Sequence, residues 1–145
     1  MGFEMSVYLE RFQGIMGQYS EELEKAGTRR KITGGLFGFG AGPGDDPCHE
    51  AMDKQVGELT AQALAEETRP EELASLVTAI LRAEKDRNWS EAAKWAVLAV
   101  QRYTIPMIPK IGPEDRKTLS EWYSQAYPKR IRLPIQKQVV KELEK

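Results

Sequence analysis

Residues 68–100 read TRPEELASLVTAILRAEKDRNWSEAAKWAVLAV, and their apolar residues recur at the three- and four-residue spacing of amphipathic helices. Thr68-Arg69-Pro70-Glu71 has the spacing of a capping box and predicts the start of one helix. Asn88-Trp89-Ser90-Glu91 repeats this signal and predicts the start of another. The expected inward residues are Leu73, Leu76, Val77, Ile80 and Leu81 in the first helix, and Ala92, Ala93, Ala96, Val97 and Val100 in the second. The stretch therefore predicts a central αα-hairpin.

Helical spacing continues on both sides of this hairpin. Before it, the pattern predicts a helix that ends near Ala26, and a second that begins at Asp46-Pro47 with an Asp cap. After it, helices are predicted to begin at Pro113 and near Pro134, because proline is tolerated in a first helical turn. The expected inward residues are, in turn, Met5, Leu9, Phe12, Met16, Tyr19 and Leu23; Met52, Val56, Leu59 and Ala63; Leu119, Trp122, Tyr123 and Ala126; and Ile135, Val139, Val140 and Leu143. The predicted fold class is all-α, a compact bundle of about six helices.

Two segments interrupt the predicted helices. Residues 28–46 are expected to form one long Gly-rich loop, since the run from Gly34 to Gly44 disfavours regular helix and strand alike. Residues 103–113, YTIPMIPKIGP, are expected to form a Pro-rich apolar connector, because three prolines prevent a helix from continuing. The apolar residues of this connector are predicted to be buried. A length of 145 residues suits one helical domain over the whole chain, 1–145.

Two glycines lie inside the first predicted helix. Each of Gly14 and Gly17 is expected to cost about 1 kcal/mol relative to alanine, unless it permits the close approach of another helix. The sequence leaves that choice open.

The composition is that of an ordinary globular protein, 41% hydrophobic and 30% charged. Lys and Arg (21) nearly balance Asp and Glu (22), so no overall field favours nucleic acid, and nucleic-acid binding is not expected. The short basic runs Arg29-Arg30-Lys31 and Lys129-Arg130-Ile131-Arg132 are interpreted as solvated helix ends, although either could meet phosphates or an acidic partner. The single cysteine, the lack of a secretory signal and the lack of a long apolar run predict a cytoplasmic protein that is not integral to a membrane.

The central hairpin resembles one unit of a tetratricopeptide repeat. The resemblance rests on small and apolar positions, which are Leu76, Ala79 and Ala83, then Ala92, Ala96 and Ala99. It covers about one period of about 34 residues, without the usual aromatic positions and without a clear second copy. The packing of any αα-hairpin accounts for the pattern as well, so no family is assigned.

The segment Asp45-Asp46-Pro47-Cys48-His49-Glu50 gathers the only cysteine and the only histidine at a predicted helix N-terminus. The helix dipole would favour a thiolate there, which makes Cys48, His49, Asp45 and Asp46 candidates for thiol chemistry. A metal reading would use His49, Glu50 and Asp53. The thiol hypothesis is weakened because the neighbouring carboxylates disfavour a thiolate. The metal hypothesis is weakened because structural zinc needs more Cys or His ligands. Helix capping is therefore preferred, and a thiol- or metal-dependent enzyme or sensor is kept as the alternative.

The function that the sequence favours is binding to another protein or to a second copy of the chain, as in a homodimer. No catalytic set with convincing spacing appears, and no cofactor is expected. The aromatic residues exceed what one small core needs, and such side chains often anchor interfaces. The candidate partner contacts are Trp89, Trp95, Trp122, Tyr123 and Tyr127.

Overall fold

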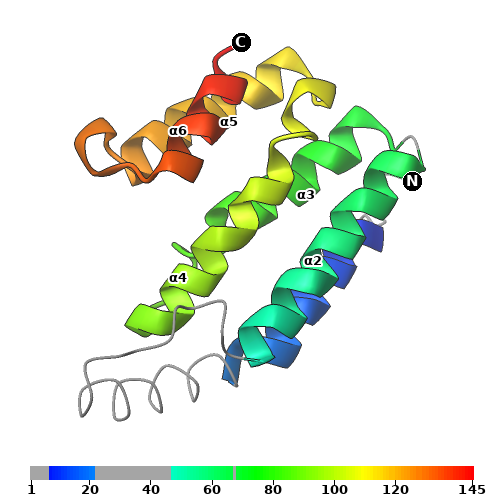
Figure 1. The fold of residues 1–145 in the computed structure, drawn as a ribbon. Helices are drawn as coiled ribbons and strands as arrows, with labels where there is room; N and C mark the ends of the chain where they lie inside the picture. The colour runs from blue at the N-terminus through cyan, green and yellow to red at the C-terminus, as the bar shows by residue number, and fades with distance from the viewer. Residues whose placement is uncertain (1–6, 22–46, 67) are drawn as a thin grey trace.

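The computed structural model describes residues 7–21, 47–66 and 68–145 (Figure 1). Within these residues the chain forms six α-helices and no strand, which confirms the all-α prediction. The predicted Gly-rich loop 28–46 lies outside them. The helices are one over residues 7–21, then α2 (Pro47–Ala65), α3 (Pro70–Arg82), α4 (Glu91–Ala99), α5 (Pro113–Ala126) and α6 (Pro134–Leu143), with the short 3-10 helices η2 (Val100–Thr104), η3 (Ile108–Lys110) and η4 (Lys129–Ile131).

The α-helices surround the short segment η2. The helix over residues 7–21 lies alongside α2, and its side chains meet α2 through hydrogen bonds from Arg11 to Gln62 and from Gln55 to Tyr19 (Figure 1). α4 packs against α2, α3 packs against α5, and α5 and α6 pack together at the C-terminal end. η2 contacts α2, α3, α4 and α6, so it lies at the centre of the bundle.

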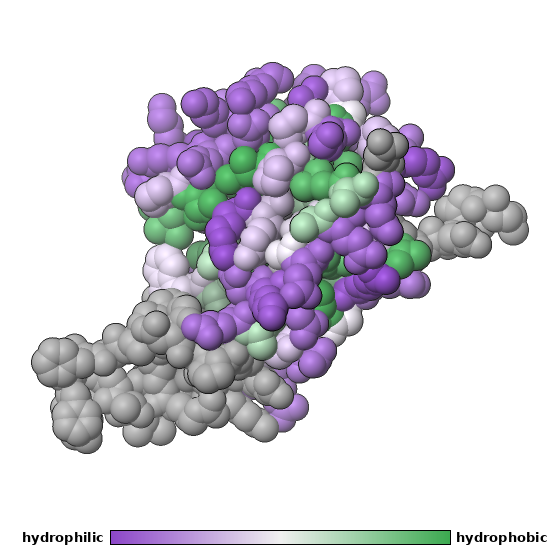
Figure 2. Space-filling model, turned by 45° about the vertical axis from the view of Figure 1, so that its right-hand side comes forward, coloured by the Kyte–Doolittle hydropathy of each residue, from purple (hydrophilic) through white to green (hydrophobic). Residues whose placement is uncertain are grey.

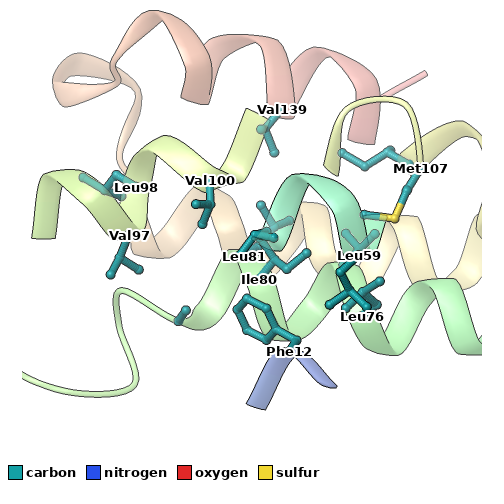
Figure 3. Close-up of a cluster of buried hydrophobic side chains, with 14 of the residues drawn as sticks. Phe12, Leu59, Leu76, Ile80, Leu81, Val97, Leu98, Val100, Met107 and Val139 are labelled. Atoms are coloured by element: carbon teal, nitrogen blue, oxygen red, sulfur yellow. The ribbon is translucent and has the colours of Figure 1, made fainter. Parts of the chain in front are cut away.

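The core draws one or more side chains from nearly every element. Figure 3 shows Phe12 of the first helix beside Ile80 and Leu81 of α3, with Val100 of η2 and Val139 of α6 in the same cluster. The predicted inward residues of α2 and α3 are all buried. In α4, Ala93, Ala96 and Val97 are buried, and Val100 is buried where η2 begins.

The first helix buries Phe12 and Tyr19 as predicted, but it buries Tyr8 and Ile15 where Leu9 and Met16 were expected. Its buried residues are Tyr8, Phe12, Ile15 and Tyr19. Leu9 and Met16 are only half-buried, and Met5 and Leu23 lie outside the described residues. Leu9 is more apolar than Tyr8, but it is the Tyr8 ring that is buried. The hydroxyl of Tyr19 accepts a hydrogen bond of 2.6 Å from Gln55.

The predicted helix starts hold to within a few residues, but the predicted caps of α3 and α4 do not. Asp46 lies outside the described residues, and the N-cap of α4 is Ser90 in place of Asn88. The hydroxyl of Ser90 caps α4 by accepting a hydrogen bond from the backbone N–H of Ala93, and prolines occupy the first positions of α5 and α6. The predicted capping box of α3 is wrong. Thr68 instead donates its hydroxyl to the carbonyl of Ala63, at the end of α2, and α3 begins at Pro70 without a side-chain cap. The hydroxyl therefore serves the C-terminal end of α2 and not the start of α3.

The connector 103–113 is buried, as expected from its sequence. Met107, Ile108 and Ile111 belong to the core, and Ile105 packs against it. The α-helix does stop before the prolines, but the chain continues in the tighter turns of η2 and η3. Among the described residues, no helix is both long and apolar enough to cross a membrane.

Candidate functional site

A pocket of about 500 Å³ opens between α2 and the continuous segment formed by α4 and η2. We call it the α2–α4 groove. Its lining residues are His49, Glu50, Asp53, Lys54, Ala96, Ala99, Arg102 and Tyr103. The α2 residues are three or four positions apart, so they share one face of that helix. Ala96 and Ala99 contribute only methyl groups, which leaves room between the two helices.

One wall of the groove is a clamp of three side chains, Asp53, Arg102 and Tyr103. The guanidinium of Arg102 donates to both carboxylate oxygens of Asp53, with N–O distances of 2.7 and 2.6 Å. Tyr103 donates its hydroxyl to Asp53 and accepts a hydrogen bond of 2.7 Å from Arg102. These contacts join α2 to η2 across 49 and 50 positions of sequence.

The polar atoms of this clamp are almost fully used. Arg102 also donates to the carbonyl of Ala99 at 2.8 Å, so the bonds of its two terminal nitrogens account for four of its N–H groups. Burial alone would raise the pKa of Asp53, but the hydrogen bonds from Arg102 and Tyr103 and the charge of Arg102 outweigh it and lower that pKa. Asp53 is thus an ionised carboxylate whose hydrogen bonds join α2 to η2.

Tyr103 also lies unusually close to the backbone of α2. A Cβ placed on Gly57 would be 2.9 Å from the Cζ atom of Tyr103 and 3.0 Å from its hydroxyl oxygen. Glycine is therefore required here for the ring to reach Asp53. Burial and the hydrogen bond to Asp53 raise the pKa of Tyr103, so its hydroxyl keeps its proton.

The residues of the thiol and metal hypotheses are only partly brought together. Asp45, Asp46 and the side chain of Cys48 lie outside the described residues. His49 and Asp53 both line the groove, but His49 is only 3% exposed and Asp53 is committed to Arg102 and Tyr103. Glu50 lines the groove as an exposed side chain. Among the side chains that the structure describes, no three His, Cys, Asp or Glu residues are grouped as metal ligands would be.

The two C-terminal tyrosines proposed as partner contacts are buried. Tyr123 is fully inaccessible and Tyr127 nearly so, and their rings are in tilted contact with centroids 4.7 Å apart. Tyr123 donates to Gln101 at 2.6 Å, and Tyr127 donates to Glu84 at 2.9 Å. Burial raises the pKa of both hydroxyls, and the hydrogen bond to Glu84 adds to the rise at Tyr127. Both hydroxyls are satisfied in the core by Gln101 and Glu84, and the two rings offer no surface to a partner.

The three tryptophans have different environments. Trp89 is half-buried and donates its indole N–H to the carbonyl of Ala83 at 3.0 Å, which satisfies a carbonyl at the end of α3. Trp122 is half-buried against Tyr127. Trp95 is 37% exposed, and with Val7 and Ile131 it is one of the exposed large hydrophobic residues of the described chain. On the face in Figure 2, hydrophobic residues reach the surface in bands among mostly hydrophilic ones.

Sequence reasoning missed Arg102, Tyr103 and Gly57 as parts of this site. Glycine inside an otherwise regular helix was the one available signal, since it often marks a close approach. Arg102 and Tyr103 carry no local signal, because their partner is 49 or more residues away. No family model, curated protein or solved structure matches the chain. Its function therefore has to be inferred from these residues.

Proposed function

We propose that the protein is a non-catalytic binding module that receives a helix of another protein in the α2–α4 groove. The observation that carries this proposal is a groove of about 500 Å³ whose α4 wall is built from alanines, together with Trp95, which is exposed one helical turn before Ala99. Tryptophan is the residue type most enriched among the anchors of protein interfaces. An exposed tryptophan next to an open groove is a suitable anchor.

The spacing of α4 places the tryptophan and the groove on one side of the helix. Ala99 follows Trp95 by four residues and Arg102 follows it by seven, so the three lie along the same face. Ala99 and Arg102 both line the groove. A segment bound in the groove would thus contact the indole ring of Trp95 as well.

A helix is the occupant that suits this shape. α2 and α4 run alongside one another in Figure 1, and the space between two such helices accepts the side-chain ridge of a third. The small side chains of Ala96 and Ala99 permit the backbone of this third helix to approach α4 closely, as small residues do at helix crossings. Recognition would then use apolar residues of the partner at positions i, i+3 or i+4, and i+7.

The ionisable groups of the groove support binding rather than catalysis. Asp53, Arg102 and Tyr103 form their hydrogen bonds with one another. A general acid or base needs a free position for a reacting proton, so this clamp is poorly suited to acid–base catalysis. The lowered pKa of Asp53 and the raised pKa of Tyr103 also move both groups away from titration near neutral pH. The clamp instead keeps the walls of the groove at a fixed distance.

The proposal is tested by selecting helical peptides from a phage-displayed library against the full-length protein. Selected peptides should carry apolar residues at helical spacing and should bind at least about tenfold more weakly to Trp95→Ala, because loss of an anchor costs about 2 kcal/mol or more. Ala99→Trp, which fills the groove from an exposed helical position, should weaken binding as much. Val7→Ala is the matched control, since Val7 is 58% exposed on another helix.

Peptides that bind all three variants as well as they bind the wild type would contradict the proposal that the α2–α4 groove is the binding site. A metal ion that copurifies in equal amount with the full chain, or fast alkylation of Cys48 near neutral pH, would contradict the non-catalytic proposal. If the protein sediments as a dimer that Ala99→Trp dissociates, the groove is retained and the occupant is a second copy of the chain.

A further inference from the structure

The C-terminal part of the chain is much more basic than the rest. Residues 122–141 contain no Asp or Glu and five basic residues, which are Lys129, Arg130, Arg132, Lys137 and Lys141. Since the whole chain has a net charge of -1, the other 125 residues together carry -6. A nearly neutral total therefore conceals a strong local separation of charge.

The fold adds two more basic residues to this region. The guanidinium of Arg82 lies 5.0 Å from the ring centroid of Trp122, and the ammonium of Lys85 lies 4.8 Å from that of Tyr127. Arg132 donates its Nε–H to the carbonyl of Tyr127 at 2.9 Å. The end of α3 and the turn η4 thus place their cations around one aromatic pair. We call this the basic surface, and its residues are Arg82, Lys85, Lys129, Arg130, Ile131 and Arg132.

Only part of this charge is neutralised within the molecule. Arg82 has Asp86 at 3.9 Å, and Lys85 has Glu84 at 3.7 Å. Among the described residues, no ion pair within 4.0 Å involves Lys129, Arg130 or Arg132. Lys129 and Arg130 are exposed and Arg132 is half-buried, and none of the three has a carboxylate partner in the described part of the chain.

An apolar side chain stands among these charges. Ile131 is 64% exposed, the most exposed of the large hydrophobic residues in the described chain. It belongs to η4, where Lys129 and Arg130 precede it and Arg132 follows it. An exposed apolar residue surrounded by charges of one sign is the pattern of a contact with both an apolar and an electrostatic part.

We infer that the basic surface is a second binding site, which takes an acidic segment of another protein that carries an apolar residue between its carboxylates. Carboxylates would pair with Lys129, Arg130 and Arg132, and the apolar residue would cover Ile131. This site is independent of the α2–α4 groove, because it is built from α3, α5 and η4, and α4 lies between α2 and the α5–α6 pair in Figure 1. The protein would then hold two partners at once.

Two observations favour a protein segment over an anionic membrane or a nucleic acid. Arg82, Lys85 and Arg132 are held in place by ring contacts and a hydrogen bond, and fixed cations favour a partner whose carboxylates are fixed as well. The charge of -6 on the rest of the chain opposes approach to an extended polyanion.

The test measures the binding of the full-length protein to a Glu-rich peptide with one central leucine. The double substitution Lys129→Ser/Arg130→Ser should weaken binding about fivefold or more, because each exposed ion pair contributes up to about 1 kcal/mol. Lys110→Ser/Lys117→Ser removes the same charge from two other exposed lysines and should leave binding unchanged. Ile131→Ser should abolish the preference for the leucine peptide over an all-Glu peptide.

Equal weakening by the two double substitutions would overturn the proposal, because binding would then follow net charge alone. Binding to phosphatidylserine vesicles or to duplex DNA in place of the peptide would also overturn it. Trp95→Ala should leave the affinity for the acidic peptide unchanged, so failure at one site is distinguishable from failure at the other. Loss of peptide binding in Trp95→Ala would contradict the independence of the two sites.

Discussion

Replacing Gly57 with alanine should destabilise the protein, although alanine is the better helix former. The new Cβ would be 2.9 Å from the Cζ atom of Tyr103, well inside the carbon contact distance of about 3.5 Å. The ring has little freedom to withdraw, because its hydroxyl is bonded to Asp53 and Arg102. Either α2 moves or the clamp opens.

The sign of the effect follows from two opposing terms. Alanine in place of glycine within a helix stabilises by about 0.5 to 1 kcal/mol. Loss of the hydrogen bonds that Tyr103 makes to charged groups costs about 1.5 to 3 kcal/mol, and the lower end applies because the side chain of Arg102 is 44% exposed. The net expectation is a loss of about 1 kcal/mol.

Gly14 and Gly17 are the matched controls, because a Cβ on either would have no atom within 4 Å. Each alanine substitution should therefore stabilise the protein by about 0.5 to 1 kcal/mol. Their occurrence in the first helix is not explained by a close approach.

The assay is urea unfolding of the full chain, with the midpoint compared at an unchanged slope. In a Tyr103→Leu background the clash is removed, so Gly57→Ala should become stabilising there. The reasoning fails if Gly57→Ala raises the midpoint in the wild-type background as much as Gly14→Ala does.

Three further predictions concern the buried and paired groups. Because the pKa of Asp53 is lower in the folded than in the unfolded protein, its contribution is present above about pH 4 and is lost as the pH falls through the folded pKa. The difference in unfolding free energy between wild type and Asp53→Asn should therefore shrink on acidification, and a difference independent of pH would contradict a charged pair with Arg102. Tyr123→Phe should cost about 1 to 2 kcal/mol in urea unfolding, because it removes the donor to the buried Gln101, and no loss would mean that the amide finds another partner. Leu76→Ala should cost about 2 to 5 kcal/mol in the same assay, since the side chain is fully buried, and a loss below 1 kcal/mol would contradict its place in the core.

The fold class could be predicted because its signals are local. The apolar stripes of α2 and α3 repeat every three or four residues, and Ser90, Pro113 and Pro134 mark helix starts through bonds or ring geometry within one turn. Each signal depends on residues that stay neighbours in the helix whatever the rest of the chain does. The burial of the connector followed in the same way from its apolar composition.

Errors arose where two helices compete for the same group or face. Thr68 had the spacing of a cap for α3, but its hydroxyl donates to the carbonyl of Ala63 in α2. In the first helix, packing in the folded bundle buries Tyr8 and Ile15, whereas the spacing of apolar residues predicted Leu9 and Met16. Neither choice is visible within one helix.

The sequence by itself determined that the chain is helical, where most helices begin and which faces of α2 and α3 are apolar, because hydrogen bonds and side-chain spacing within a helix are local. Only the tertiary structure decided that Asp53 meets Arg102 and Tyr103, that Tyr127 turns inward, and that Trp95 stays exposed. These outcomes depend on contacts between residues dozens of positions apart. Such contacts form only when several apolar faces are buried together, and no local pattern encodes which polar groups then meet.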